Sequence, residues 1–447
     1  MSDIHGLIKD LGGGLILRRA IPEDTESLAE FNSRVHSDDG WEKPFAPAAV
    51  WTRDLMTKDH PTFSPGDFTI VEDTATKQIV SSLNLISQTW SYAGIPFKVG
   101  RPELVGTHPD YRNRGLVRAQ FEVVHQWSAE RGELLQAITG IPYYYRQFGY
   151  EMAMNLGGGR IGYLPHIPKL GENEDEPYII RPAVEADLAF IASTYQHASQ
   201  RYLVACLRSK AEWRYELLGH DPKSVNYFRL AVIETPSGEA RGFIAHGGAL
   251  WGTSLSLIQY ELKPGVSWLA VTPSVVRYLQ KVGEAMAAEE GSKPYQAHRF
   301  SLGEEHPVYE AHPNLAPRLF EPYTWYLRLP DMLAFLKLIT PVLEERLAKS
   351  VACGHSGELK LTFYGEGLRF DLESGKIKSI EPYQPAPTLD RGDAAFPGRS
   401  FAQLLFGWRS ISEMVRVYPD CWVGNDPARA LLNAFFTRQI SNVWPLN

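Results

Sequence analysis

Apolar and polar positions follow a pattern that occurs twice along the chain. A short apolar stretch, an acidic turn and a helix-like apolar period follow one another over 17–35, and they recur 163 residues later over 180–195. A second pair of similar strands, at 71–74 and 232–235, has nearly the same offset. Because each repeat combines strands with an amphipathic helix, the pattern predicts two copies of one α/β domain.

The remainder of the chain has a different pattern. Leucines at helical spacing over 333–347 precede alternating apolar and polar residues over 358–364, which predicts a small α+β module. A charged, proline-terminated stretch at 169–177 indicates a linker between the two repeats. The predicted domains are residues 1–168, 177–322 and 323–447.

Composition narrows the class of protein. Of 447 residues, 44% are hydrophobic, and the formal charge is −7, so we expect several packed cores and no nucleic-acid partner. The amino terminus lacks a secretory apolar region and no apolar span is long enough for a bilayer, which predicts a cytoplasmic protein without a membrane partner. Three cysteines without a CxxC pair, and 13 histidines without a metal-ligand spacing, predict neither disulfides nor a metal.

The candidate chemistry is concentrated at residues 103–118. A strand enters a turn at Pro109, and an amphipathic helix begins near Gly115. Free backbone amides and the helix dipole favour an anion at such a helix start, and glycine lets it approach closely. Arg112 and Arg114 strengthen the positive field. The alternative is a surface loop with two solvated arginines.

The pattern Arg112-x-x-Gly115-x-Val117 after a strand resembles the pyrophosphate loop of the GCN5-related N-acetyltransferase (GNAT) superfamily. Val117 departs from the small residue usual at the last position. The whole chain resembles the enhanced-intracellular-survival branch, which has a GNAT domain, a second degenerate GNAT domain and a sterol-carrier-protein-like module. The resemblance implies mixed, mostly antiparallel, splayed sheets flanked by helices.

The resemblance also implies an acetyl-CoA-dependent N-acetyltransferase. Acetyl-CoA is the donor substrate, and the backbone of Val105 and Thr107 pairs with its pantetheine arm. The implied diphosphate-binding residues are Arg112, Asn113, Arg114, Gly115, Leu116 and Val117. The second GNAT copy has no such loop and is expected to be structural, and the two later domains are expected to shape the acceptor cleft and the interface of a homo-oligomer.

Three consecutive tyrosines, 143–145, follow the strand predicted at 134–139 and lie on a short predicted helix that ends at Gly149. Their side chains diverge on a helix, so they cannot share one role. The family pattern places a tyrosine four residues before the Gly-aromatic pair, at Tyr145. The resemblance implies that Tyr145 protonates the departing thiolate, and the alternative is a packing role.

Two groups are candidates for the general base. Glu103 projects to the same strand face as Val105 and can act directly or through water, or it can pair with an arginine. The resemblance implies the terminal carboxylate instead, here that of Asn447, although the family favours a terminal aromatic residue.

The acceptor is expected to be a primary amine of a small molecule or peptide. Aromatic and acidic residues occur together at 38–68, which is either an acceptor-lining region or a solvated loop anchored in the core. These residues are Asp38, Asp39, Trp41, Glu42, Phe45, Trp51, Asp54, Phe63 and Phe68.

A second hypothesis is a non-catalytic, acyl-CoA-sensing or lipid-binding protein that uses its carboxy-terminal domain. Apolar residues there either line a tunnel or form a closed core, and the small size of the domain favours the core. These residues are Leu333, Phe335, Phe363, Phe370, Phe401 and Phe406.

Overall fold

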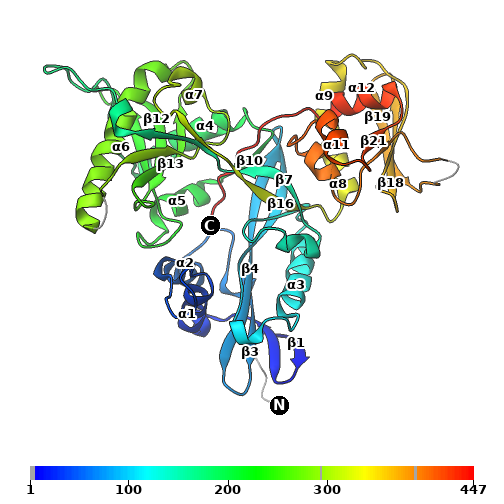
Figure 1. Cartoon of the computed structure of the whole chain (residues 1–447), viewed down its shortest axis with the longest axis horizontal. Coiled ribbons are helices and arrows are strands. Elements are labelled where there is room, and N and C mark those ends of the chain that lie inside the picture. Colours follow the sequence, from blue (N-terminus) through cyan, green and yellow to red (C-terminus); the bar gives the residue numbers. More distant parts are fainter. Residues whose placement is uncertain (1–5, 292–293, 387–389) are drawn as a thin grey trace.

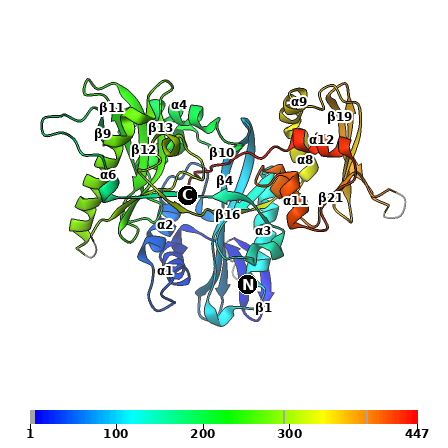
Figure 2. The same cartoon turned by 45° about the horizontal axis from the view of Figure 1, so that its top comes forward.

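The computed structural model of the chain describes residues 6–291, 294–386 and 390–447. Within these residues, three sheets flanked by helices form three units that meet near the centre of the molecule (Figure 1). A view turned by 45° shows the same arrangement (Figure 2). The predicted mixed α/β class is confirmed, and no described helix combines the length and apolarity needed to cross a bilayer.

The first unit contains a mostly antiparallel sheet. In spatial order its strands are β1 (Leu7–Gly12), β2 (Leu15–Arg19), β3 (Phe68–Asp73), β4 (Gln78–Tyr92), β5 (Ile95–Thr107), β6 (Leu135–Ile138), β16 (Tyr323–Arg328) and β7 (Glu151–Leu156), with β10 (Val204–Leu207) paired to β4. Its helices are α1 (Thr25–Val35), α2 (Ala46–Thr57) and α3 (Leu116–Glu130).

The second unit has the same kind of sheet. Its strands, in spatial order, are β15 (Arg318–Phe320), β8 (Gly159–Tyr163), β14 (Ala297–Phe300), β13 (Ser254–Leu262), β12 (Ala240–Gly247), β11 (Phe228–Glu234) and β9 (Ile179–Pro182). Its helices are α4 (Leu188–Ser199), α5 (Lys210–Leu218), α6 (Trp268–Glu290) and α7 (Pro307–Ala311).

The carboxy-terminal module is smaller. Its sheet consists of β19 (Lys376–Tyr383), β18 (Gly367–Glu373), β17 (Gly357–Thr362), β20 (Ala394–Ala395) and β21 (Trp422–Val423). Its helices are α8 (Met332–Leu338), α9 (Thr340–Ala348), α10 (Phe401–Leu405), α11 (Ile411–Val417) and α12 (Asp426–Phe435).

The sequence repeat corresponds to one ion-pair arrangement that both units contain. In each, an arginine on the strand before the first helix contacts one carboxylate in the following turn at 2.7 Å and another on the neighbouring strand at 2.8 Å. The two sets are Arg18 with Asp24 and Glu72, and Arg181 with Asp187 and Glu234. The arginine fixes the entry into the first helix of each unit.

The strand pairing differs from the predicted boundaries at residues 168 and 323. β8 precedes residue 168 but pairs with β14 and β15 in the second sheet, and β16 follows residue 322 but lies between β6 and β7 in the first. Gly157, Gly158 and Gly159 have positive φ between β7 and β8, so the chain turns directly from one sheet to the other. This exchange of β8 and β16 between the sheets gives hydrogen-bond partners to backbone groups that would otherwise lie unpaired at a sheet edge.

The carboxy-terminal module shares its core with the first unit. Phe335 of α8 packs against Tyr92 and Phe97, with ring centroids 5.8 and 5.2 Å apart, and the Tyr92 hydroxyl donates to the Leu405 carbonyl at 2.8 Å. Four of the six residues of the predicted tunnel or core, Phe335, Phe370, Phe401 and Phe406, are buried in this core. Leu333 and Phe363 line one cavity and Phe406 borders another. Because four of the six are buried in the core, the described structure resembles the closed-core alternative more than a tunnel.

The last residues, 436–447, form a tail that returns from the module to the centre of the molecule. The tail is red in Figure 1 and ends near β4 and α5. Its backbone pairs with the start of β10, because the Leu203 amide donates to Ile440 at 2.8 Å. Trp444 is buried against Trp213, and the Arg208 guanidinium lies 3.8 Å from the centre of its ring. The tail therefore joins the module to the second unit.

Trp444→Ala removes the largest apolar contact of the tail, and we expect it to lower the free energy of unfolding by about 3–5 kcal/mol. Urea denaturation followed by circular dichroism measures the change. Val351→Ala is the control, since Val351 is 95% exposed and its truncation should change stability by less than about 0.5 kcal/mol. Equal midpoints for W444A and the wild type would show that the tail is not anchored by this residue.

Candidate active site

Strands β5 and β6 separate at the centre of the first sheet. They run parallel, but only Val99 and Gly100 of β5 are in register with β6. Beyond Gly100, β5 continues to Thr107 beside β4 and has no strand on its other side. A bulge at Leu104, where φ is 51°, twists β5 away from β6. The separation leaves a strand edge that an extended ligand can pair with.

The loop after β5 leads into a helix whose first turn has no side-chain cap. A 3-10 turn spans Pro109–Tyr111, Asn113 and Gly115 have positive φ, and α3 starts at Leu116. Gly115 is the residue before the helix and has no side chain to bond the first amides. A Cβ built on Gly115 would meet no atom within 4 Å, so the space over the helix start is open. Amides in this setting are a binding site for an anion.

The loop and the open strand edge border one cavity of about 610 Å³. We call it the loop cavity. Its opposite wall is formed by Ile141, Tyr144, Gln147 and Phe148. All eight predicted donor-binding residues line it: Val105, Thr107, Arg112, Asn113, Arg114, Gly115, Leu116 and Val117. The structure thus brings them together, and their role in binding remains a prediction.

The loop cavity is bordered by positive charge. Among the described residues, the guanidinium groups of Arg112, Arg114 and Arg118 form no ion pair. Arg114 lies 4.7 Å from the centre of the Tyr111 ring and donates to the Asp110 carbonyl at 3.1 Å. Arg118 was not among the predicted residues, although it lies one helical turn after Arg114 and that spacing indicates a shared face.

Tyr145 lies in a 3-10 turn, Tyr144–Phe148, where a short helix was predicted. Its ring is 4% exposed and packs 5.4 Å from that of Tyr326 on β16. The hydroxyl lies 3.4 Å from where a Cβ on Gly140 would be, so it is at the carboxyl end of β6. Burial, and then the charge of Glu103, raise the pKa of Tyr145 and keep the phenol protonated.

The three tyrosines have different environments, as predicted. Tyr143 is 73% exposed, Tyr144 lines the loop cavity and Tyr145 is buried. The three therefore differ in access to the cavity.

Glu103 forms an ion pair with Arg101 on the same strand. The Arg101 side chain is buried and that of Glu103 is 14% exposed. Burial raises the pKa of Glu103, and Arg101 opposes the rise. Arg101 also donates to the side-chain oxygen of Asn447 and to the Leu446 carbonyl. One arginine thus contacts Glu103 and the side chain of Asn447, the residue whose terminal carboxylate was the other predicted base.

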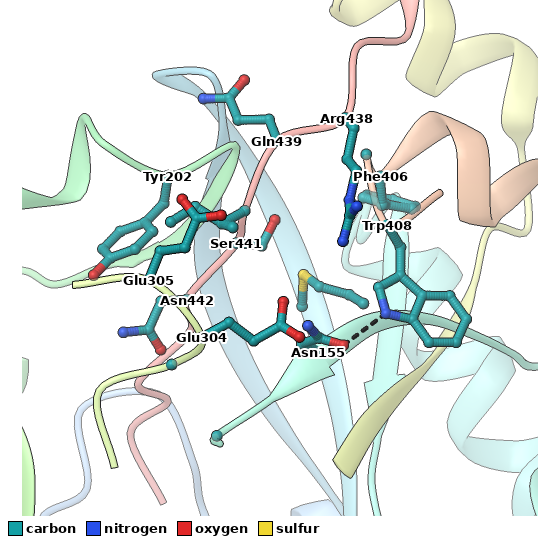
Figure 3. Close-up of a pocket in the computed structure, with 15 residues that line it drawn as sticks. Asn155, Tyr202, Glu304, Glu305, Phe406, Trp408, Arg438, Gln439, Ser441 and Asn442 are labelled. Carbon is teal, nitrogen blue, oxygen red and sulfur yellow. Dashed lines mark hydrogen bonds between the residues drawn. The ribbon is translucent and has the colours of Figure 1, made fainter. Parts of the chain in front are cut away.

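The tail reaches Arg101 through the junction of the three units. Figure 3 shows it passing between Tyr202 of the second unit and Trp408 of the module. The Trp408 indole donates to Asn155 of β7 at 2.6 Å, which fixes the module against the first sheet. Beyond the junction, the Arg208 guanidinium donates to the carbonyls of Trp444 and Pro445 at 3.0 and 3.1 Å. These bonds direct the tail toward Arg101.

The predicted acceptor-lining residues divide into two groups. Phe63 and Phe68 belong to the core beneath α1 and α2, and Asp54 is buried, where it accepts from the Asp221 amide at 2.9 Å. These three have structural roles. The remaining residues of the set are half-buried or exposed: Asp38, Asp39, Trp41, Glu42, Phe45 and Trp51.

The described part of the second unit shows no equivalent of the open helix start. The helix in the corresponding position, α6, is capped by Ser267, whose hydroxyl accepts from the Ala270 amide at 3.3 Å. Trp268 packs at the same place against Tyr260 and His306, with ring centroids 4.8 and 5.1 Å away. The described side chains also include no group of three or more His, Cys, Asp or Glu placed to hold a metal ion.

The sequence profile of the acetyltransferase (GNAT) domain family matches residues 22–153, which contain the loop and Tyr145. The chain therefore carries a GNAT acetyltransferase domain. No curated protein sequence is significantly similar to the chain.

Solved structures resemble the chain over most of its length. A GCN5-related N-acetyltransferase from Anabaena variabilis has a TM-score of 0.63 at 13% identity, with 96% of this chain and 99% of that chain covered. One from Kribbella flavida has a TM-score of 0.61 at 17% identity, covering 96% and 97%. Eis1 from Mycobacterium abscessus has a TM-score of 0.53 at 14% identity, covering 84% and 89%. At these identities the similarity shows the fold.

The Arg101–Glu103 pair supplies a test of the site's electrostatics. Arg101→Gln leaves a buried carboxylate without its partner, and we expect a loss of about 3–5 kcal/mol in the free energy of unfolding. In the double variant R101Q/E103Q the loss should be smaller than the sum of the two single losses, because no charge is left unpaired. Urea denaturation of all four proteins measures the coupling, and additive losses would show that the two charges do not interact.

Proposed function

We propose that the chain is an acetyl-CoA-dependent N-acetyltransferase that transfers acetyl to a primary amine by direct attack, with the chemistry in the first unit. The observation that carries the proposal is the uncapped start of α3 in a cavity beside an open strand edge. A diphosphate and an extended amide-containing arm are the two parts of a ligand that these features would bind.

The donor would lie along the loop cavity. The diphosphate would be held by the backbone amides from Arg112 to Val117 and by the guanidinium groups of Arg112 and Arg114. This assignment is supported by the observation that these two arginines form no ion pair among the described residues. The backbone of Val105 and Thr107 would pair with the pantetheine arm. The thioester would then be directed toward the gap between β5 and β6, near the Tyr145 hydroxyl.

In the reaction, the amine nitrogen forms a bond to the thioester carbonyl carbon and the carbon–sulfur bond breaks. The amine loses a proton to a base, and the departing thiolate takes one from Tyr145. Because burial raises the pKa of Tyr145, the phenol carries its proton at neutral pH and would give it up only as negative charge develops on the sulfur. Alignment of the two reactants would contribute to the acceleration.

Two groups remain proposed as the base. Glu103 is supported by burial, which raises its pKa, and by its electrostatic influence on Tyr145. The terminal carboxylate of Asn447 is supported by the contact between that residue and Arg101. Because Arg101 contacts both residues, it would position whichever one accepts the proton.

The acceptor is proposed to be the amine of a small molecule or peptide. Exposed Asp38 and Asp39, near Trp41, would attract a cationic amine. The Trp41 ring lies 4.3 Å from that of His108, at the start of the loop, so this surface adjoins the proposed donor site.

Tyr145→Phe should lower kcat for acetyl transfer by about 100-fold, because it removes the proton donor and keeps the ring. The KM for acetyl-CoA should stay within about twofold. A thiol-release assay with acetyl-CoA and a panel of primary amines measures both constants.

Tyr143→Phe is the matched control, since it removes a hydroxyl from an exposed neighbour, and it should retain wild-type kcat. An unchanged kcat in Y145F would reject the proposed acid. A wild-type protein that acetylates no amine in the panel, although it binds acetyl-CoA, would count against the transferase assignment.

A further inference from the structure

A second cavity, of about 720 Å³, lies where the carboxy-terminal module meets the first unit. We call it the module cavity. It is bordered by the end of β16 and the segment that follows it, by the turn between β17 and β18, by the end of β19 and by the start of α10. It has no lining residue in common with the loop cavity. Its volume is in the range of sites for small organic ligands.

Two arginines lie close together in the lining of the module cavity. If Gly149 carried a Cβ, that atom would lie 3.2 Å from the Arg328 side chain and 3.6 Å from the Arg399 guanidinium. Arg328 is half-buried and donates to Gln136, and among the described residues neither arginine forms an ion pair. Burial and the charge of Arg399 lower the pKa of Arg328, which reflects the cost of placing two like charges together.

The rest of the lining is apolar or carries isolated charges. Leu329, Leu333, Phe363, Leu368 and Ala402 form the apolar part. Asp331 and Glu366 also line the cavity, and an oxygen of Asp331 accepts from the Ala334 amide at 2.8 Å as the cap of α8. The lining therefore combines apolar side chains, two arginines that lie close together and two carboxylates.

We propose that the module cavity binds a small amphipathic carboxylate, with its carboxylate between Arg328 and Arg399 and its apolar body against Leu333 and Phe363. A planar carboxylate matches the guanidinium fork and relieves the repulsion between the two arginines. A singly charged headgroup fits better than a phosphate dianion, because Asp331 and Glu366 would repel the second negative charge.

The site adjoins the segment that carries Tyr145. Gly149 ends the 3-10 turn that contains Tyr145, and β16 carries both Arg328 and Tyr326, whose ring packs on Tyr145. A ligand at this site therefore contacts the ends of two elements that hold Tyr145 in place. The binding proposal itself does not depend on the proposed acetyl transfer.

Isothermal titration calorimetry on the full chain, without acetyl-CoA or amine, tests the proposal. Octanoate and 4-phenylbutyrate are the probes, and the tighter of the two identifies an aliphatic or an aromatic body. Octanamide has the aliphatic body without the charge, and acetate has the charge without the body. We expect at least one probe to bind, and octanamide and acetate to bind at least about tenfold more weakly than that probe.

Two variants locate the site. Arg399→Gln should weaken binding of the tighter probe about tenfold, and Leu333→Glu, on the apolar side, should do the same. Arg416→Gln is the matched control, because Arg416 is an exposed arginine of α11 outside the cavity lining, and it should bind as the wild type does. Circular dichroism confirms that each variant is folded.

Several results would overturn the proposal. These are the absence of binding by both probes, octanamide or acetate binding as tightly as the probes, and undiminished binding by folded R399Q and L333E. Because the readout is binding without acetyl-CoA, loss of this proposal would leave the proposed acetyl transfer intact, and the reverse also holds.

Discussion

Among the described residues, no side chain caps the first amides of α3, and the candidate site depends on this constraint. Gly115 gives them no side-chain cap, and the space above them is open. In the second unit Ser267 caps the corresponding helix, and aromatic rings fill the adjacent space. The same fold thus presents an open helix start in one unit and a closed helix start in the other.

Around that helix start, the surrounding elements complete the site from distant parts of the chain. The separation of β5 from β6 opens the strand edge, and β16, which enters from beyond the second unit, supports the Tyr145 ring. The tail then brings Asn447 to Arg101 and so to Glu103. The second unit and the module therefore act on the site by positioning β16 and the tail.

Local features could be predicted from the sequence. The position of α3 and the different environments of the three tyrosines follow from residue types and spacing within about 40 residues. The insertion of β16, the transfer of β8 to the second sheet and the contact of Arg101 with Asn447 could not be predicted. They depend on contacts between segments separated by up to about 350 residues, and a short strand carries no signal for which sheet it joins. The buried aromatic residues of the module gave the right composition for a core, but not the fact that Tyr92 and Phe97 of the first unit complete it.

The central claim is that the start of α3 holds the diphosphate of acetyl-CoA. Calorimetric titration of acetyl-CoA into the wild type and into R112Q/R114Q tests it most directly, because the double variant removes two positive charges and leaves the backbone amides. We predict saturable binding to the wild type and at least about tenfold weaker binding to the double variant, with a smaller dependence on salt concentration. Equal affinities, or no binding to the wild type, would contradict the claim.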